Sequence, residues 1–478
     1  MPKSFKIMTK RTKIVATISP QTGAPEFLSQ LFEAGVNVIR INTAHQDIEG
    51  AKILINNIRN ANSAVAILVD TKGPEVRTSS LGTSIQVNKG DIIFVKGDKN
   101  GTCECNTVFV NYDNFVNEIP VGNRILIDDG DVELVVIDKN DDALVCEVKN
   151  SGEIKLRKGV NVPGVELKLP VISDKDRAFI EFAIENELDF IAHSFVQHVS
   201  DILEIKALLN EKQSFIKVIA KIENQTGVDN IDAIIEESDG IMVARGDLGI
   251  EIPIERIPVI QREIVRKCLR MNKPVIIATQ MLHTMITNPR PTRAEVTDVA
   301  TAVHEKADAL MLSGETAVGA YPIEAVNVMT RVICESEKLL DTYTLKPRIA
   351  GHTVLSVLAQ AAVAACETLP IKAIIVDTLT GRTANYIAAY RGKIPVYAFC
   401  YSEMVCRQMA LTFGVEAYAI NKKDSRDMFL TETLERLIAE NKVTLSDTVA
   451  VIGGSFGPTN GASFITIASV ANLAYYKE

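Results

Sequence analysis

Eight short apolar runs, each ending in a polar or charged residue, constrain the fold of this chain more than any other feature. Helix-length segments separate them, except for one much longer gap after the third run. Strands buried on both faces read as continuous runs of Val, Ile, Leu and Ala rather than as alternations. The pattern therefore predicts an α/β fold built on a parallel (β/α)8 TIM barrel, whose active site lies at the carboxyl ends of its strands. The runs are residues 13–19, 36–42, 64–70, 188–194, 215–221, 239–245, 273–279 and 307–313.

The long gap indicates an inserted domain, because about 117 residues separate Asp70 from Leu188. Between residues 73 and 170 the helical period is lost, and short alternating stretches are broken by Gly, Asn and Asp. We expect a small β-barrel cap domain here. Since it leaves and re-enters the barrel after strand three, the cap should lie over the catalytic face. The TIM barrel itself is then assigned to residues 1–72 and 171–344.

A second α/β pattern covers residues 345–478 and predicts a separate C-terminal domain. Its apolar runs at 373–376, 396–399, 416–420 and 448–453 alternate with helical segments. The loops 378–383 and 453–459 offer hydroxyls, backbone N–H groups and one Arg, and the first of them leads into a helix N-terminus. Such loops suit a phosphate, although Gly/Ser/Thr loops are more often plain turns. The candidate effector-binding residues are Thr378, Thr380, Gly381, Arg382, Thr383 and Ser455.

Composition limits the partners of this chain. A net charge of −9 leaves no basic surface for nucleic acid, and no apolar segment has the length of a membrane span. The eight cysteines show no CxxC pair, which is typical of a reduced compartment. We therefore expect a cytoplasmic enzyme that binds neither nucleic acid nor membrane.

Four charged residues follow two adjacent barrel strands. Lys221 and Glu223 are two residues apart at the end of the fifth strand, so their side chains point the same way. Arg245 and Asp247 follow the sixth strand. Two carboxylates with few other ligands suit Mg²⁺ that is completed by water and substrate oxygens. The alternative is a salt-bridge network that only closes the end of the barrel.

Other strand ends contribute further polar groups, and the chain has neither a P-loop nor a protein-kinase Gly-rich loop. Spacing alone predicts a site that contains Mg²⁺ and a lysine and binds a substrate with a phosphate or carboxylate group. The further strand-end residues are Arg40, Asn42, Asp70, Thr71, Ser194, Thr279 and Ser313.

Longer motifs identify a family. They are residues 12–18 (TKIVATI), 70–77 (DTKGPEVR), 221–224 (KIEN), 242–249 (MVARGDLG), 278–282 (ATQML) and 311–317 (MLSGETA). In this order, and over essentially the whole chain, the sequence resembles pyruvate kinase. The resemblance implies transfer of phosphoryl from phosphoenolpyruvate to ADP, which gives pyruvate and ATP in glycolysis. It also implies Mg²⁺ (or Mn²⁺) and K⁺ as cofactors, a homotetramer, and activation by a phosphorylated allosteric effector.

The resemblance assigns roles at the barrel mouth. Arg40 would grip the transferring phosphate, and Lys221 would neutralise charge on the phosphoryl group and the developing enolate. Glu223 and Asp247 would hold Mg²⁺. Phosphoryl transfer depends on positioning and charge neutralisation more than on covalent catalysis, so the assignment of function rests mainly on these cations.

The remaining substrate and nucleotide contacts follow in the same way. The backbone N–H groups of Gly246 and Asp247, with the hydroxyl of Thr279, would bind the substrate carboxylate. Ser313 would lie near the proton path to the enolate. The positions that contact ADP in the family are His45, Arg77 and Lys158.

This chain departs from the usual family pattern near the monovalent cation. Where the family reads Asn-Phe-Ser-His, residues 42–45 read Asn-Thr-Ala-His, so Ala44 lacks a hydroxyl ligand. Asn42, Asp70 and Thr71 remain as K⁺ ligands. The glutamate at position 75 is similar to the K⁺-dependent branch of the family. Further departures, which bear on subunit contacts and regulation, are Gln197, His283, Glu305 and Lys306.

Two other functions compete with this assignment. A Mg²⁺-dependent aldolase or lyase of the phosphoenolpyruvate/pyruvate type also uses Glu and Asp at adjacent strand ends, but it needs no nucleotide-binding cap. A non-catalytic metabolite sensor would use only the C-terminal loops, and the intact set of Lys221, Glu223 and Asp247 argues against it.

Overall fold

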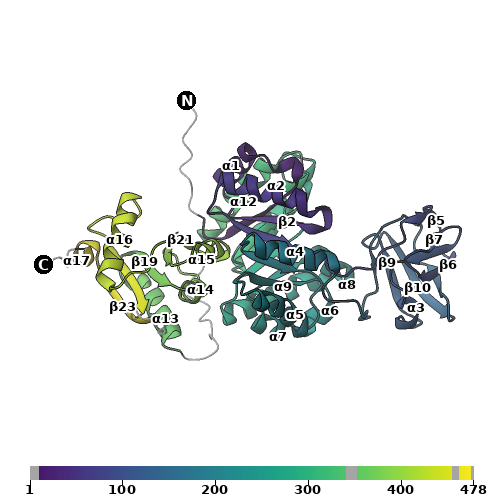
Figure 1. The fold of residues 1–478 in the computed structure, drawn as a ribbon. Coiled ribbons are helices and arrows are strands. Elements are labelled where there is room, and N and C mark those ends of the chain that lie inside the picture. The colour runs from purple at the N-terminus through teal and green to yellow at the C-terminus, as the bar shows by residue number, and fades with distance from the viewer. Residues whose placement is uncertain (1–9, 341–352, 455–461, 475–478) are drawn as a thin grey trace.

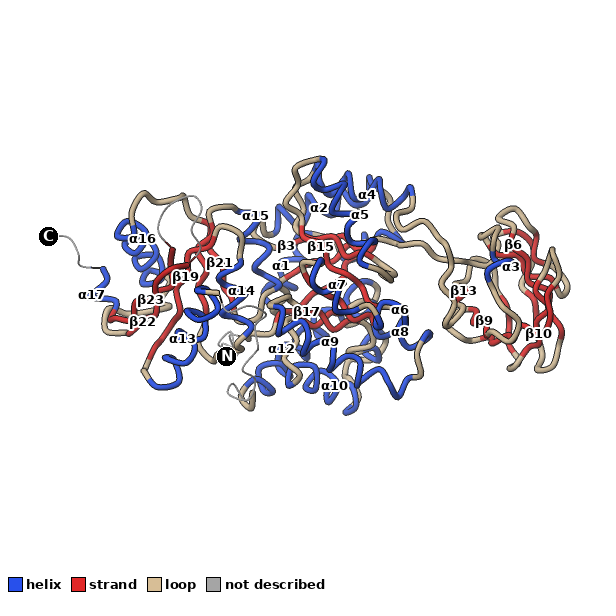
Figure 2. Tube along the Cα trace, turned by 90° about the horizontal axis from the view of Figure 1, so that it is seen from below, coloured by secondary structure: helices blue, strands red, loops and turns tan. Residues whose placement is uncertain are grey.

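The computed structural model describes residues 10–340, 353–454 and 462–474. The chain folds into three parts arranged in a row, with the barrel in the middle (Figure 1). The cap domain lies beyond one end of the barrel, and the C-terminal domain packs against the other end (Figure 2).

The central part is a closed barrel of eight parallel strands, in the order β1-β18-β17-β16-β15-β14-β3-β2. Each predicted apolar run coincides with one of these strands, and only β15 extends past its run, by one residue, so the sequence prediction of the barrel is confirmed. Their side chains are almost completely buried, as expected for strands covered on both faces. The strands are β1 (Lys13–Ile18), β2 (Val38–Asn42), β3 (Ala66–Asp70), β14 (Phe190–His193), β15 (Lys217–Ile222), β16 (Gly240–Ala244), β17 (Val275–Ala278) and β18 (Ala309–Leu312).

Helices surround the barrel and begin at the caps that the sequence provides. The Ser173 hydroxyl accepts from the N–H of Asp176 at the start of α4, and Thr292 forms a capping box with Glu295 at the start of α10. Such caps stabilise a helix by about 1 kcal/mol each. The barrel helices are α1 (Pro25–Ala34), α2 (Ile48–Ala61), α4 (Asp174–Glu185), α5 (Val199–Glu211), α6 (Gln225–Asp229), α7 (Ile231–Glu237), α8 (Arg245–Glu251), α9 (Ile257–Met271), α10 (Arg293–His304), α11 (Gly314–Ala317) and α12 (Pro322–Glu337).

The inserted cap is the β domain that the sequence predicts. Its strands form a six-stranded sheet, β13-β9-β10-β11-β6-β8, and two pairs, β12-β5 and β4-β7, which share one apolar core. The elements are β4 (Leu81–Gly82), β5 (Ile85–Val87), β6 (Ile92–Gly97), β7 (Thr102–Cys103), β8 (Thr107–Val110), α3 (Phe115–Glu118), β9 (Arg124–Ile127), β10 (Val132–Lys139), β11 (Leu144–Val148), β12 (Gly152–Ile154) and β13 (Val160–Asn161).

The C-terminal domain has a five-stranded sheet in the order β21-β20-β19-β22-β23, with helices on both faces. Its last strand is antiparallel to its neighbour. The elements are α13 (Val354–Thr368), β19 (Ile371–Thr378), α14 (Arg382–Ala389), β20 (Val396–Cys400), α15 (Glu403–Gln408), β21 (Val415–Ala419), α16 (Arg426–Ala439), β22 (Thr448–Gly454), β23 (Ala462–Ser469) and α17 (Val470–Ala474). The predicted boundary at residue 345 lies outside the described residues.

Buried ion pairs join the C-terminal domain to the amino ends of the barrel strands. Arg391 Nη2 donates to Oδ2 of Asp308, just before β18, at 2.6 Å. Arg407 Nε lies 2.7 Å from Oδ1 of Asp189, just before β14. Leu411 joins the apolar cluster inside the barrel. The carboxyl ends of the strands therefore remain open toward the cap domain.

Candidate active site

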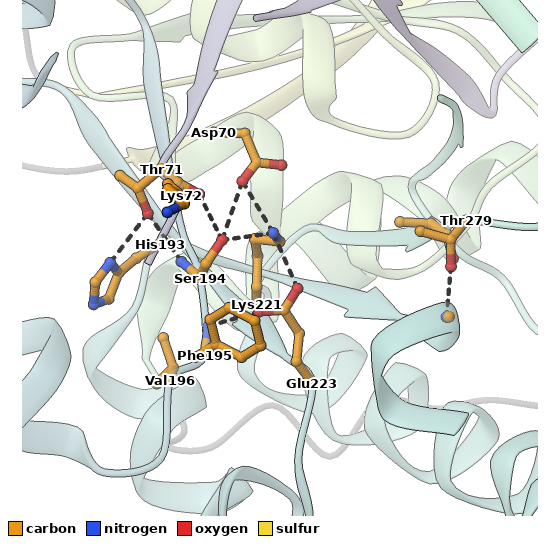
Figure 3. A network of polar contacts seen from close by, with 12 residues as sticks. Asp70, Thr71, Lys72, His193, Ser194, Phe195, Val196, Lys221, Glu223 and Thr279 are labelled. Atoms are coloured by element: carbon orange, nitrogen blue, oxygen red, sulfur yellow. Dashed lines mark hydrogen bonds and ion pairs between the residues drawn. The ribbon is translucent and has the colours of Figure 1, made fainter. Parts of the chain in front are cut away.

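Lys221, near the carboxyl end of β15, lies at the centre of a buried polar network (Figure 3). Its ammonium is 3.0 Å from Asp70 Oδ1 and 3.0 Å from Glu223 Oε1. It also donates to the hydroxyl of Ser194 at 2.6 Å. The network thus joins three neighbouring strands, and the side chains of Lys221 and Glu223 do project together into the barrel mouth.

The network keeps Asp70 and Lys221 charged. Burial raises the pKa of the Asp70 carboxyl, but the charges of Arg40 and Lys221 outweigh this effect and hold that pKa below its usual value. Burial lowers the pKa of the Lys221 ammonium, but the carboxylates of Asp70 and Glu223 outweigh this effect and hold that pKa above its usual value. The surrounding carboxylates therefore favour the charged form of the ammonium in the mouth of the barrel.

Arg40 is the second buried cation of the mouth, from β2. Its Nε donates to Asp70 Oδ2 at 2.6 Å, and its Nη1 donates to the hydroxyl of Thr17 at 2.9 Å. Asp70 thus holds Arg40 with one oxygen and Lys221 with the other. This shared carboxylate sets the positions of two cations that could face the same phosphate.

Glu223 and Asp247 both line a cavity of about 420 Å³ between the barrel and the cap. Glu223 Oε2 accepts from the backbone N–H of Phe195 at 2.6 Å. Burial, only partly offset by Lys221, and the nearby charge of Asp247 raise the pKa of Glu223 to about 7. A divalent cation would relieve this crowding of negative charge, so the two hard oxygen donors fit Mg²⁺ or Mn²⁺.

No larger metal cluster is present in the described parts of the chain: no three His, Cys, Asp or Glu side chains are grouped to hold a metal ion. Arg245 does not join the Lys221 network. Its guanidinium instead bonds Asp298 at 2.7 Å and the carbonyl of Thr279 at 2.8 Å. The four charges that follow strands five and six therefore do not form a single salt-bridge network.

Thr279 and Gly246 form a second polar site at the start of α8. The N–H of Gly246 donates to the hydroxyl of Thr279 at 2.7 Å, and this hydroxyl donates to the carbonyl of Ala278. Thr279 has a φ of 65°, and the next residue, Gln280, has a φ of 55°. A β-branched residue rarely adopts this conformation, which costs about 1–3 kcal/mol and is typical of functional sites.

Ser313 directly follows β18 at the same end of the barrel. Its backbone N–H donates to Glu315 at 2.7 Å. Its hydroxyl is buried and has no hydrogen-bond partner among the described residues. Buried hydroxyls are rarely left unpaired, so this group is available to a water molecule or a substrate.

The cap brings two of the three predicted nucleotide residues to the 420 Å³ cavity. Arg77 and Lys158 line it, whereas His45 is exposed and lies outside the cavity lining. Arg77 makes two bonds to Glu75, of 2.6 and 2.9 Å, and Lys158 lies 3.0 Å from Asp128. Both cations are thus paired with carboxylates in this structure.

The predicted K⁺ ligands lie on adjacent strands, because Asn42 and Asp70 are register partners at the ends of β2 and β3. Asn42 Oδ1 accepts from the N–H of Ala44 at 3.1 Å. The carbonyl of Thr71 accepts from the Ser194 hydroxyl at 2.7 Å. An amide oxygen, a carboxylate and a carbonyl suit a hard cation.

In the C-terminal domain, the loop before α14 is closed by its own side chains. The Thr378 hydroxyl accepts from the N–H of Gly381 at 2.9 Å, and Gly381 has a φ of 81°. Arg382 lies over the ring of Tyr386. The candidate Ser455 lies outside the described residues.

Several partners of the site residues were not assigned from the sequence. Thr17 bonds Arg40, the backbone of Phe195 bonds Glu223, and Asp298 bonds Arg245. The sequence does offer one signal for Thr17. Like Ser194, it is a hydroxyl residue at the carboxyl end of a barrel strand.

Sequence and structure comparisons place the chain among known proteins. The family model of the pyruvate kinase barrel domain matches residues 9–326, and that of the pyruvate kinase alpha/beta domain matches residues 356–468. A pyruvate kinase of Borreliella burgdorferi is 45% identical over 453 residues, which cover 94% of each chain. One of Bacillus licheniformis is 42% identical over 97% of this chain and 81% of its own length.

A solved structure agrees with these relatives. The crystal structure of a pyruvate kinase from Cryptosporidium parvum superimposes with a TM-score of 0.91 and 38% identity, over 96% of each chain. None of the described helices is long and apolar enough to cross a membrane. The match extends over barrel and C-terminal domain alike, and the chain therefore belongs to the pyruvate kinase family of phosphotransferases.

Proposed function

We propose that Lys221 is the central catalytic cation in the transfer of phosphoryl from phosphoenolpyruvate to ADP. The observation that carries this proposal is its position: a buried ammonium within 3.0 Å of Asp70 and Glu223, at the open end of the barrel. Charge that develops on the phosphoryl group and the enolate would be neutralised there. In a site with little water, such neutralisation is worth several kcal/mol of barrier.

Arg40, which is held by the other oxygen of Asp70, would orient the phosphoryl group. Its Nε and Nη1 are fixed by Asp70 and Thr17, so its Nη2 is the nitrogen left to approach an oxygen of the substrate. Mg²⁺ or Mn²⁺, held by Glu223 and Asp247, would supply further positive charge to the phosphate oxygens. This arrangement positions the substrate without a covalent intermediate.

The substrate carboxylate would lie at the start of α8. The N–H groups of Gly246 and Asp247 point to this end of the helix, where an anion is favoured. The N–H of Gly246 now donates to Thr279, so the carboxylate would take over this bond and accept from the Thr279 hydroxyl as well. Ser313, with its unpaired buried hydroxyl, would take part in proton delivery to the enolate.

ADP would enter between the barrel and the cap. Arg77 and Lys158 would bind its phosphates after exchanging their present partners, Glu75 and Asp128. His45 would contact the nucleotide only after a movement that brings it to the cavity. K⁺, held by Asn42, Asp70 and Thr71, would add positive charge beside Arg40 and Lys221.

The C-terminal domain would regulate the enzyme allosterically. A phosphorylated metabolite would bind Thr378, Thr380, Gly381, Arg382 and Thr383, together with Ser455, and would shift a cytoplasmic homotetramer between two states. The support is the sequence of the loop and the position of α14, which runs from this loop toward Arg391 at the barrel interface.

A coupled assay tests the reaction against the competing aldolase or lyase function. Pyruvate is measured from phosphoenolpyruvate and Mg²⁺, with ADP and without it. We expect pyruvate only in the presence of ADP, with ATP formed in equal amount. Pyruvate formed at the same rate without ADP would contradict the phosphotransfer.

A further inference from the structure

Two cysteines of the C-terminal domain lie next to one another at the end of β20. Cys400 is the last residue of this strand, and Cys406 lies in the last turn of α15, six residues further along the chain. Cys406 packs against the apolar cluster that contains Cys400. The Cys400 thiol donates a hydrogen bond to the sulfur of Cys406. The fold therefore brings two free thiols into contact across one short turn.

The two thiols differ in their access to solvent. Cys400 is completely buried, whereas Cys406 is half-buried. The carbonyl of Ala398 lies 3.9 Å from the sulfur of Cys400, so it is a distant second acceptor for that thiol. A small reagent from solvent would therefore reach the sulfur of Cys406 first and find the thiol of Cys400 behind it.

The contact also divides the proton unequally between the two sulfurs. The hydrogen bond to Cys406, together with burial, raises the pKa of the Cys400 thiol. The same bond lowers the pKa of the Cys406 thiol and outweighs the effect of burial there. The charges of Arg436 and Arg407 also lower it, and the charge of Glu403 opposes them. A thiolate is therefore favoured at the half-buried sulfur, with a protonated thiol beside it.

We propose that Cys400 and Cys406 form a redox-sensitive pair, which closes into a disulfide when the chain meets a peroxide. An accessible thiolate beside a second, resolving thiol is typical of redox-sensing cysteines. In a reduced compartment such a disulfide is transient rather than structural. The two free thiols seen here are then the resting form of the pair.

Closure takes two balanced steps. The thiolate of Cys406 attacks one oxygen of hydrogen peroxide, and the O–O bond breaks. The departing hydroxide takes up the proton that Cys406 had released and leaves as water, so Cys406 becomes a sulfenic acid. The sulfur of Cys400 then attacks that of Cys406, the S–O bond breaks, and the Cys400 proton leaves with the hydroxide as a second water. Two thiols are oxidised to one disulfide, one peroxide is reduced to two waters, and a dithiol reverses the change.

The disulfide would form at the turn of the C-terminal domain that holds the barrel. Arg407 directly follows Cys406, and its Nε donates to Asp189 at 2.7 Å. The next residue, Gln408, donates to the carbonyl of Phe215 at 2.9 Å. A covalent link between this turn and β20 therefore acts at the contact between the C-terminal domain and the barrel.

Mass spectrometry tests the pair directly, because trypsin releases both cysteines in one peptide, residues 394–407. The intact chain is treated with hydrogen peroxide, alkylated with iodoacetamide and digested. We expect this peptide to lose two hydrogens and to take up no alkyl group, and dithiothreitol before alkylation should restore two alkylated cysteines. Cys366, half-buried in α13 of the same domain, is the internal control, because burial raises its pKa to about 11.

Cys406 should react with peroxide about tenfold faster than Cys366. Because the pKa of Cys406 lies below the ordinary thiol value, its thiolate is about a hundredfold more abundant at neutral pH than that of Cys366. The stronger nucleophilicity of the less acidic thiolate offsets about tenfold of this difference.

Variants separate the roles of the two sulfurs. Cys400→Ser should stop the reaction at the sulfenic acid of Cys406, which dimedone traps, and Cys406→Ser should leave Cys400 reduced. Cys366→Ser, the matched control, should form the disulfide as the unchanged chain does. Oxidation of Cys406 to sulfinic acid without any disulfide in the unchanged chain would overturn the proposal. So would a peptide 394–407 that stays reduced at a peroxide dose that oxidises Cys366.

Discussion

The ammonium of Lys221 lies 3.0 Å from Oε1 of Glu223, two residues further along the chain at the end of β15. The pair places a fixed cation beside a carboxylate that is crowded by Asp247. A metal bound to Glu223 and the ammonium of Lys221 would therefore act on the same phosphate. The first two predictions separate these contributions.

Replacing Lys221 by Met should abolish turnover and leave the fold intact. The change removes the central cation and keeps a similar volume, so we expect kcat to fall roughly a thousandfold or more. Steady-state kinetics of the variant measure the loss. Lys217→Met, on the same strand but paired with Asp239 at its far end, is the matched control and should retain near-normal kcat. More than a tenth of normal kcat in Lys221→Met would rule out the catalytic role.

Glu223→Gln and Asp247→Asn should raise the Mg²⁺ concentration needed for half-maximal rate, and should also lower that rate. Each variant loses a charged oxygen ligand and keeps the shape of the side chain. A Mg²⁺ titration of activity gives both quantities. Glu251→Gln, which alters a carboxylate of the same cavity, should leave the Mg²⁺ requirement almost unchanged. A normal Mg²⁺ titration in Glu223→Gln would remove this residue from the ligand set.

The enzyme should be activated by K⁺, and Ala44→Ser should lower the K⁺ concentration needed. Asp70 keeps the negative charge of the site, and a lost hydroxyl can be replaced by water. The rate is measured against KCl, with a large organic cation holding ionic strength constant. Full activity without K⁺ would contradict the cation site. The same half-activating concentration in both proteins would contradict the role given to Ala44.

Sugar phosphates and AMP should include an activator that lowers the half-saturating concentration of phosphoenolpyruvate. Arg382→Ala should weaken that activation and leave the basal rate unchanged, because α14, which begins at Arg382, belongs to the C-terminal domain on the side of the barrel away from the cap (Figure 1). Substrate saturation curves with each compound measure both effects. If no compound changes half-saturation or cooperativity, the C-terminal domain has only a structural role.

His193 should make the protein less stable in mild acid. Burial lowers the pKa of this imidazole to about 4, so between about pH 6.5 and 4 the unfolded chain binds a proton that the folded chain does not. Its contribution to the free energy of unfolding should fall by about 2 kcal/mol between about pH 7 and about pH 5. Denaturant unfolding at the two pH values should show this loss, and His193→Asn should lack it. An equal loss in the variant would assign the acid sensitivity to other groups.

The barrel could be predicted from the sequence because its strands are buried on both faces and read as uninterrupted apolar runs. The strand β23 (Ala462–Ser469) of the C-terminal domain was missed. It is a partly exposed edge strand that carries Ser and Thr among its apolar residues. It gives neither the continuous nor the regularly alternating pattern on which the prediction rests.

The gathering of Glu223 and Asp247 at the carboxyl ends of two adjacent strands was predictable, but most individual contacts of the site were not. That Lys221 and Glu223 face the same way follows from the period of a strand, whereas the contacts of Lys221 with Asp70 and Ser194 depend on the closure of the barrel. Periodicity carries no information on which strands become neighbours. The same reason explains why the ion pairs of Asp308 and Asp189 with the C-terminal domain could not be predicted.

The contact of Asp308 with the C-terminal domain lies only one barrel strand away from the catalytic end of the barrel. Asp308 is held by Arg391, and the chain then runs through β18 directly to Ser313. The five residue steps from Asp308 to Ser313, in extended backbone, span only about 17 Å. A change of angle between the C-terminal domain and the barrel would therefore reach the catalytic end through one stiff covalent segment, without passing through a flexible loop.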